Sequence, residues 1–375
     1  MKKIGILLTL LSLFQNTYSQ LISESVSSKR LQESRKIIVY TPEKYDPKQA
    51  YPLFMVLDAG YMMEPVMAST RFYEYFEDMP ESIIVGVFNT PEDVYIEEEV
   101  GVPQNQSAQF YDFLATELIT HLSAKFKLSP FKGIIAEGRS AFFTNYYLLK
   151  EKSVFDAYFL LNPQLLSHIN EPLATQLPLF KKPIFYYLAT SSLEKEKNYQ
   201  ATKDLDNQLR NISLPESVSY YFEDFGRVSK NSVALSGIAR AFDFLFDVYK
   251  PISDREFEEK ILTLEEDFFD YLKNKYEQIY QKMGQRKKPI IDDILMIYEA
   301  SLRKKDSYSL LKLSEFVSDN GYKETALPSF ILGHYYEEMG EPKKALRAYQ
   351  KAYTQKMIDF ITPELIDKRM SALKN

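Results

Sequence analysis

The sequence contains no cysteine, no tryptophan and only three histidines among its 375 residues. Without cysteine the chain cannot form disulfide bonds, so a packed core alone must stabilise the fold. No zinc-binding pattern is present, and the 12 glycines form no phosphate-binding loop. The formal net charge of −6 argues against a nucleic-acid partner, because phosphate binding needs a basic face. We therefore expect a globular protein without a cofactor or a metal ion.

The amino terminus has the pattern of an export signal. Lys2 and Lys3 precede an apolar run over residues 4–14, and a polar segment with Ser19 follows. The apolar run is too short for a comfortable membrane span and is typical of a signal peptide. We predict that residues 1–19 are a signal peptide, with an uncleaved amino-terminal anchor as the alternative.

No cysteine follows the apolar run, so a lipid anchor of the lipoprotein type is excluded. No later segment is long and apolar enough to span a bilayer, and we expect no transmembrane segment after signal cleavage. These features predict a periplasmic or secreted protein, or one associated with the outer membrane.

Apolar runs alternate with helical patterns from residue 27 to about residue 250. This alternation predicts an α/β fold with a mostly parallel sheet and helices on both faces, as one domain over residues 20–252. The expected strands are residues 35–41, 52–57, 82–88, 133–136, 157–161, 183–189 and 217–222, and the expected helices are residues 109–126, 142–150, 199–211 and 232–249.

No strand pattern remains after about residue 252, so we predict an all-α second domain over residues 253–375. Its glycines and prolines punctuate short helices, as in helical hairpins. The expected helices are residues 257–282, one that Pro289 opens, 308–318, 328–339, 342–353 and 363–373.

Part of this helical tail has the spacing of one tetratricopeptide repeat (TPR). The matching residues are Leu332, Gly333, Tyr336, Gly340, Ala345, Tyr349 and Ala352. The proline expected near the end of the repeat is replaced by Met357. Upstream, residues 290–321 have the two-helix length of a decayed repeat. Two repeats are too few for an independent solenoid, so we expect the tail to pack on its own first helix or on the preceding domain. It is either a groove that docks a partner or a structural cap.

The segment from Gly133 to Phe143 reads as a strand, a tight turn and a helix, with Ser140 in the turn. Together with blocks at residues 51–58, 84–89, 113–119 and 155–163, it resembles the putative-esterase family of α/β-hydrolases. That family includes the ferric-enterobactin esterases and the esterase D-like enzymes. The resemblance covers roughly residues 30–250 and implies an α/β-hydrolase fold.

The resemblance implies a role for each site position. Ser140 matches the family's nucleophile, and its oxyanion donors would be the amide of Ala141 and the turn at Ala59 and Gly60. Glu194 lies in the loop where the family places the acidic member of its triad.

The catalytic histidine of the family falls in the loop after the strand at residues 217–222, where this sequence has Phe225. Phenylalanine cannot take the proton of a serine hydroxyl, so the triad lacks its base. Among the histidines, His168 is the candidate for a substitute base, because it follows a strand near the carboxyl edge of the sheet.

Two further positions depart from the family pattern. Phe142 stands two residues after Ser140, where the family keeps a small residue. Residues 90–94 replace an arginine–aspartate pair that active relatives carry after the position of Asn89. Departures in three separate loops suggest that the fold is kept for a purpose other than ester hydrolysis.

Each singled-out residue also has a purely structural interpretation. Ser140 fits a small turn residue, Glu194 a solvated charge run, and Asp58 a helix cap or turn. Arg139 fits a surface or salt-bridged arginine, or one that holds an anion. The acidic residues 97–99 resemble an exposed loop, because no further ligand is spaced to complete a metal site.

These observations favour a non-catalytic binding or scaffold protein of the cell envelope, whose hydrolase-like domain and helical tail bind envelope protein partners. A second hypothesis is an active serine esterase that uses Ser140 on a carboxylic or siderophore-like ester. A third is a pseudoenzyme that keeps a small ester or another ligand in the vestigial pocket.

Overall fold

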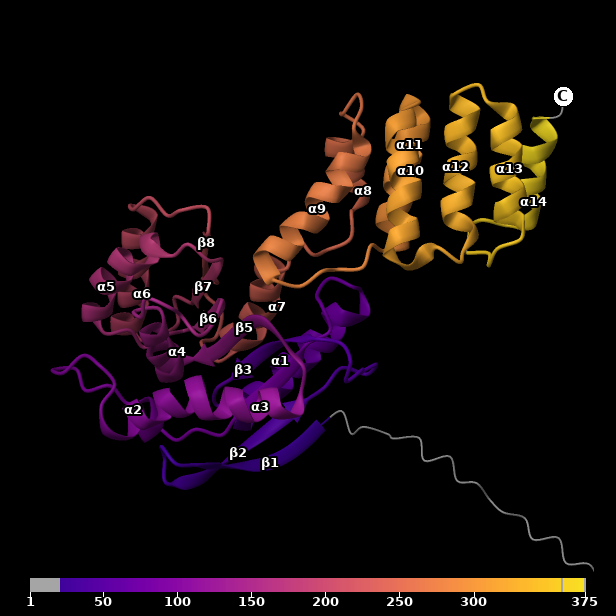
Figure 1. Ribbon diagram of the computed structural model, residues 1–375. Helices are drawn as coiled ribbons and strands as arrows, with labels where there is room; N and C mark the ends of the chain where they lie inside the picture. Colours follow the sequence, from indigo (N-terminus) through magenta and orange to yellow (C-terminus); the bar gives the residue numbers. More distant parts are fainter. Residues whose placement is uncertain (1–20, 359, 374–375) are drawn as a thin grey trace, which may run out of the picture.

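An eight-stranded sheet forms the centre of the amino-terminal part of the chain, in the order β1-β2-β4-β3-β5-β6-β7-β8 (Figure 1). The computed structural model describes residues 21–358 and 360–373, so the predicted signal peptide lies outside the described residues. Strands β3 to β8 pair in parallel, whereas β2 pairs antiparallel with both β1 and β4. The strands are β1 (Leu21–Ser28), β2 (Glu33–Tyr40), β3 (Tyr51–Val56), β4 (Ile83–Val87), β5 (Leu128–Glu137), β6 (Ala157–Leu161), β7 (Ile184–Thr190) and β8 (Val218–Asp224).

Side chains alternate between the two faces of this sheet, as the period of a strand requires. In β3, Leu53 and Met55 belong to one buried cluster, whereas Phe54 and Val56 belong to another. The Phe54 cluster is covered by α1 (Ala59–Tyr75) and α7 (Ser232–Leu245). The opposite face is covered by α2 (Asn105–Asp112), the π-helical η2 (Phe113–Leu118), α3 (Ile119–Lys125), α4 (Gly138–Thr144), α5 (Asn170–Gln176) and α6 (Glu196–Arg210). The predicted α/β fold, with helices on both faces of a mostly parallel sheet, is confirmed.

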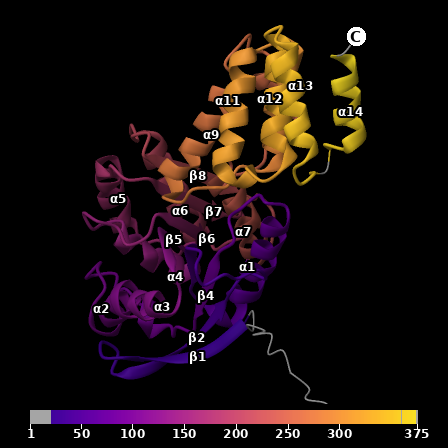
Figure 2. The same cartoon turned by 45° about the vertical axis from the view of Figure 1, so that its right-hand side comes forward.

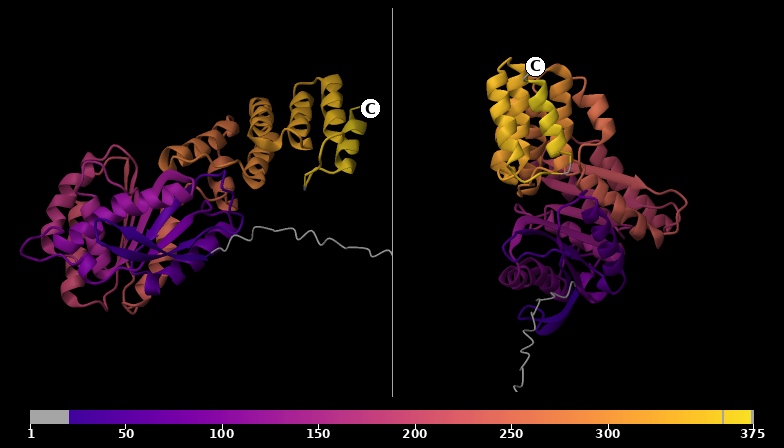
Figure 3. Two further views of the ribbon diagram at one scale, coloured as in Figure 1. Left: turned by 60° about the horizontal axis from the view of Figure 1, so that its bottom comes forward. Right: turned by 90° about the vertical axis from the view of Figure 1, so that its right-hand side faces the viewer.

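From residue 254 onward, the described part of the chain forms helices and no named strand. These helices stand side by side in an array that projects from the α/β part (Figures 1 and 3). They are α8 (Asp254–Glu256), η6 (Phe257–Ile261), α9 (Phe268–Met283), α10 (Ile291–Lys304), α11 (Ser307–Val317), η7 (Ser318–Tyr322), α12 (Ala326–Glu338), α13 (Pro342–Tyr353) and α14 (Pro363–Ala372). In the part of the chain that the structure describes, none of the helices combines the length and the apolarity that a membrane crossing requires.

The prediction of one long helix over residues 257–282 is wrong. The helix ends after Ile261, and α9 begins only at Phe268, after Asp267 adopts a left-handed backbone with φ 65°. Tertiary contacts hold this break: the Asp267 amide donates to Asp306 at 2.9 Å, and the Phe269 amide donates to Ser309 at 2.9 Å. A helical periodicity continues through the break, which is why the sequence alone concealed it.

The helical tail shares a hydrophobic core with the α/β part. Buried residues of α9 to α14 belong to the same cluster as those of α1 and α7, and Figure 2 shows the tail standing beside these helices. Within the tail, α12 and α13 approach closely at Gly333, where a Cβ atom would lie 2.3 Å from the Tyr349 ring. Ala345 and Ala352 are fully buried at the same contact. The tail therefore packs on the preceding domain, whereas its assignment as a TPR stays a prediction.

Strand β1 and helix α1 are two of the elements that the sequence did not predict; the short helix α5 is another. Strand β1 alternates exposed residues with half-buried or buried ones, as an edge strand does, and most of its residues are polar, so it lacks an apolar run. Helix α1 contains Pro65 and has an irregular apolar pattern, yet it covers the sheet through buried Met62, Met63 and Val66. Both elements matter for the site, because α1 begins where β3 ends.

A cavity of about 1000 Å³ separates the end of α1 from the connection between α9 and α10. Glu74 of α1 lines it and accepts hydrogen bonds from the Ser82 amide at 2.8 Å and the Tyr40 hydroxyl at 3.3 Å. Burial raises the pKa of Glu74 to about 8. Lys287 lines the other side, donates to the Tyr249 carbonyl, and has its pKa lowered by burial to about 8.

Replacing Glu74 with Gln should change how stability depends on pH. Because folding raises the Glu74 pKa from 4.5 to about 8, its contribution is fully present below pH 4.5 and is lost as pH rises through 8. Between pH 4.5 and pH 8 the free energy of unfolding of the variant should therefore rise relative to that of the native protein, by on the order of 3 kcal/mol at pH 8.

Urea unfolding at pH 5, 6.5 and 8 measures the difference. Lys287 does not obscure it, because its folded pKa of about 8 and its ordinary value of 10.5 place its effect above this window. The control is Glu43→Gln, on the rim of the same cavity. Parallel pH curves for native protein and Glu74→Gln would contradict a protonated Glu74.

Candidate functional site

A cavity of about 340 Å³ lies where the parallel strands end, at the edge of an open α/β sheet that usually holds ligands. Each of these strands is followed by, or ends on, a polar residue that lines the cavity. In spatial order these residues are Asn89 after β4, Asp58 after β3, Glu137 at the end of β5, Asn162 after β6, Glu194 after β7 and Lys230 after β8.

Ser140 sits in the turn between β5 and α4 that the sequence predicted. Gly138 begins α4 with a left-handed φ of 59°, which lets the chain reverse directly from strand to helix. Ser140 is 1% exposed and still lines the cavity. Helix α4 begins earlier than the predicted residue 142, so the serine lies in its first turn.

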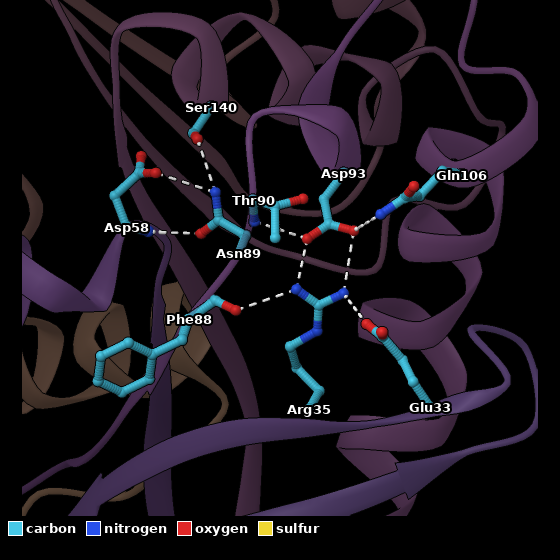
Figure 4. Close-up of polar contacts among 9 residues, drawn as sticks. All are labelled: Glu33, Arg35, Asp58, Phe88, Asn89, Thr90, Asp93, Gln106 and Ser140. Atoms are coloured by element: carbon cyan, nitrogen blue, oxygen red, sulfur yellow. Dashed lines mark hydrogen bonds and ion pairs between the residues drawn. The ribbon is translucent and has the colours of Figure 1, made fainter.

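Asn89 joins Ser140 to Asp58 (Figure 4). Its side-chain amide donates to Asp58 Oδ1 at 2.9 Å and to Ser140 Oγ at 3.3 Å, while its carbonyl oxygen accepts from the Asp58 backbone amide at 2.6 Å. Burial raises the pKa of the Asp58 carboxyl, and hydrogen bonding from Ser140 and Asn89 partly offsets that rise. The hydroxyl of Ser140 is thus held by a carboxylate and an amide.

A buried ion pair anchors the loop that carries Asn89. Arg35 of β2 contacts both carboxylate oxygens of Asp93, at 2.5 Å and 3.0 Å, and donates to the Phe88 carbonyl at 3.0 Å (Figure 4). Asp93 also accepts from the Thr90 amide at 2.7 Å and from Gln106 at 2.9 Å. Neither Arg35 nor Asp93 is more than 4% exposed. The loop at residues 90–94 therefore holds an arginine–aspartate pair whose arginine comes from another strand.

Glu137 is the second carboxyl at the base of the cavity. Burial raises its pKa, a hydrogen bond from Tyr61 lowers it, and the charges of Asp58 and Glu194 raise it further. Glu194 accepts hydrogen bonds from the Lys195 amide at 2.9 Å and from Asn198 at 3.1 Å. The structure thus brings Glu194 to the same cavity as Ser140, although no imidazole joins the two.

The residue at the family's histidine position does not enter the cavity lining. Phe225 follows β8, donates its amide to the Thr190 carbonyl at 2.9 Å, and packs against the cluster beneath α7, near Gly237. His168 lies in the short helix η4 (Ser167–Ile169), where its Nε2 atom lies 3.1 Å from the Tyr146 hydroxyl. It is not among the residues that line the cavity either.

The other two histidines do not line the cavity either. His121 of α3 pairs with Glu24 of β1 at 3.1 Å, and His334 of α12 lies 2.7 Å from the Tyr298 hydroxyl in the helical tail. Since the sequence has only three histidines and all lie within the described residues, no imidazole lines the cavity.

Phe142 is accommodated without displacing the turn. It is 2% exposed and its ring packs edge-on against Tyr146 and His168, with centroids at 5.6 Å and 6.0 Å. The large side chain is thus part of the core of that sheet face.

The predicted oxyanion donors lie at two helix starts. Ala59 and Gly60 are the first residues of α1, and Ala141 follows Ser140 in the first turn of α4. Because β3 and β5 are neighbours in the sheet, both helices begin at the same edge. Asp58, directly before Ala59, places a carboxylate at this point.

Arg139 and the acidic residues 97–99 both lie at the surface. Arg139 is exposed, lines the mouth of the cavity, and lies over the Tyr95 ring with its Cζ atom 5.9 Å from the ring centroid. Residues 97–99 are exposed, and no group of three or more acidic or histidine residues among those described could hold a metal ion.

Sequence reasoning gave no site role to Tyr61, Asn89, Glu137, Asn162 and Lys230. A usable signal existed, because Asn89, Glu137 and Asn162 lie at or shortly after strand ends of a predicted parallel sheet, and Lys230 lies in the loop after the last strand. Tyr61 gave no such signal, since the helix that carries it was not predicted.

Comparison with known proteins concerns both the family of the α/β part and the fold of the whole chain. Residues 28–160 match a family model described as "Putative esterase". A crystal structure of an uncharacterised protein from Capnocytophaga ochracea is 44% identical, with a TM-score of 0.90, covering 95% of this chain and 99% of that one. No curated protein is detectably similar to this sequence.

Two more distant structures are similar in fold. An IroE-like serine hydrolase from Shewanella oneidensis is 17% identical with a TM-score of 0.60, over 80% of this chain and 99% of that one. The BES protein from Bacillus cereus is 18% identical with a TM-score of 0.53, over 65% and 98% of the two chains.

The buried ion pair makes a direct prediction for stability. Asp93→Asn would remove the buried counter-charge of Arg35 and leave only the exposed Glu33 as its ion-pair partner, so we expect a loss of about 3 kcal/mol in the free energy of unfolding. Asp112→Asn is the control, because its pair with Arg30 is exposed at 45% and 57% and should contribute no more than about 1 kcal/mol. Equal losses in urea unfolding would show that the Asp93 pair does not anchor the loop.

Proposed function

Because the chain belongs to the putative esterase family, we propose that it is a non-catalytic member, which binds a ligand or a partner protein instead of hydrolysing an ester. The observation that carries this proposal is the absence of an imidazole from the residues that line the Ser140 cavity. A serine hydroxyl is a weak nucleophile unless a neighbouring base takes its proton. Phe225, at the family's base position, has no atom that can do so.

The surroundings of Ser140 also oppose the chemistry of ester cleavage. Attack on an ester creates a negative oxygen that must be stabilised by hydrogen-bond donors. Here Asp58 places a carboxylate beside Ser140 and Asn89. Two unit charges about 4 Å apart repel by roughly 4 kcal/mol near a protein surface, so an oxyanion at this point would be disfavoured.

The protein would act in the cell envelope and bind partner proteins there. The amino-terminal pattern of Lys2, Lys3 and an apolar run would direct the protein to the periplasm or the outside of the cell. There the hydrolase-like domain and the helical tail would act as a binding or scaffold component of the envelope. The shared core between the two parts means that a partner would meet one rigid unit.

One observation favours a second candidate, an active serine esterase. The hydroxyl of Ser140 hydrogen-bonds to the Asp58 carboxylate, which could serve as a base without an imidazole. The Shewanella oneidensis relative is named as a serine hydrolase. On this alternative the substrate would be a carboxylic or siderophore-like ester.

A fluorophosphonate probe separates the two candidates, because it reacts with serines that a base has activated. We expect the folded native protein to show no more labelling than Ser140→Ala, with a known serine esterase labelled in parallel. Labelling that disappears in Ser140→Ala would identify an activated serine and rule out the non-catalytic assignment.

Restoring the missing base should restore reactivity. In Phe225→His we expect the polar imidazole to leave the apolar cluster beneath α7 and turn towards the cavity, where it would raise the labelling rate of Ser140 by at least about 10²-fold, the lower end of what a positioned base supplies. Phe225→Leu is the matched control, since it keeps an apolar side chain and adds no base. No gain in Phe225→His, in a sample that unfolds cooperatively, would contradict the view that the missing imidazole is the decisive defect.

A further inference from the structure

Charged groups around the Ser140 cavity are separated by depth. Asp58 and Glu137 are half-buried at its base, and they follow neighbouring strands in register, since Val56 pairs with Ile135. The cationic residues Arg139, Lys195 and Lys230 line the same cavity, and all three are exposed. The cavity therefore has an acidic floor and a basic rim.

An independent feature of the floor points to a ligand that donates hydrogen bonds. Asn162 lines the cavity, is 4% exposed, and donates its side-chain amide to the Lys230 carbonyl at 2.6 Å. That bond leaves its Oδ1 atom as a free acceptor, with no hydrogen-bond partner among the described residues. A buried acceptor without a partner is costly, so a donor from a ligand would stabilise it.

The carboxyl groups also favour a ligand that donates hydrogen bonds. Glu137 is destabilised in its charged form by burial and by the charges of Asp58 and Glu194. A group that brings positive charge and several N–H donors would relieve this repulsion and satisfy the acceptors together. An ammonium group has three donors and no acceptor, which fits a floor composed of carboxylates and an amide oxygen.

We propose that this cavity binds a small zwitterion, with its ammonium group between Asp58 and Glu137 and its carboxylate at the basic rim. A volume of about 340 Å³ is at the lower end for small-molecule sites and suits an amino acid or a similarly small molecule. The inference rests on the proposed function, because a working esterase would hold an ester carbonyl, not an ammonium group, beside Ser140.

A metal ion is the other cation that an acidic floor could attract. Hard metal ions take six or more oxygen ligands, or several carboxylates around one point. No group of three or more acidic or histidine side chains in the described part of the chain has that arrangement. The exposed cations of the rim would also repel a metal ion, whereas they match the carboxylate end of a zwitterion.

Calorimetric titration of the purified protein tests the proposal with a defined panel. The probes are glycine, 4-aminobutanoate and 6-aminohexanoate, beside butanoate, which lacks the ammonium group, and butylamine, which lacks the carboxylate. We expect at least one of the zwitterions to bind tenfold or more tightly than either half-molecule. Binding of butanoate as tight as that of every zwitterion, or binding of no zwitterion, would overturn the proposal.

Variants locate the two ends of the ligand. Glu137→Gln keeps the shape of the floor and should weaken zwitterion binding about tenfold, because a charge-assisted hydrogen bond is lost. Arg139→Gln should weaken the zwitterion but leave butylamine unchanged. Glu81→Gln, beside the other cavity, is the control for a distant charge change. Unchanged binding in Glu137→Gln, with unfolding like the native protein, would reject the assigned floor.

The same samples are treated with the fluorophosphonate probe, so that the two proposals fail separately. Absence of both labelling and zwitterion binding would overturn this inference and leave the non-catalytic assignment intact. Ser140-dependent labelling without zwitterion binding would overturn both.

Discussion

The buried ion pair between Arg35 and Asp93 fixes the loop after β4, and the polar floor of the cavity depends on that loop. Arg35 also holds the Phe88 carbonyl, the last backbone group before Asn89. Asn89 in turn binds both the backbone and the carboxylate of Asp58, and it reaches Ser140. A side chain on an antiparallel strand near the sheet edge therefore determines which groups surround the serine. Because the pair is almost fully buried, it can maintain that geometry only while both charges are present.

The sheet explains why polar groups gather around one cavity although Phe225 stands where the resemblance places a histidine. The core strands place their carboxyl ends at one edge, whatever residues follow them. Here those residues are three carboxyls, two amides and a lysine, and Phe225, where the resemblance places a histidine, packs into the core beneath α7. Phe142 has likewise become part of the core on the other face. Both phenylalanines are thus compatible with tight packing, and the cavity has a polar lining.

The parts of the fold with strong local patterns were predictable. The apolar runs of β3, β4, β6 and β7 were recognised because buried parallel strands need continuous apolar residues. Strand β1 was missed because an edge strand can remain polar, and the break before Phe268 was missed because Asp306 and Ser309, distant in sequence, stabilise it. Ser140 was found from the strand–turn–helix pattern around it. The partners of that serine, Asp58 and Asn89, were indicated only by their positions after predicted strands.

Composition and local pattern alone determined several properties of this protein. They predicted the order of most strands and helices, the change to an all-helical region near residue 252, and the strand–turn–helix around Ser140. Tertiary structure decided the rest. It determined which acid lies beside the serine, that His168 contacts the Tyr146 hydroxyl, and how the tail joins the core. The physical reason is that periodicity and turn chemistry act between neighbours in sequence. Ion pairs such as Arg35–Asp93 and contacts such as Asp58–Asn89 join residues that only the folded sheet brings together.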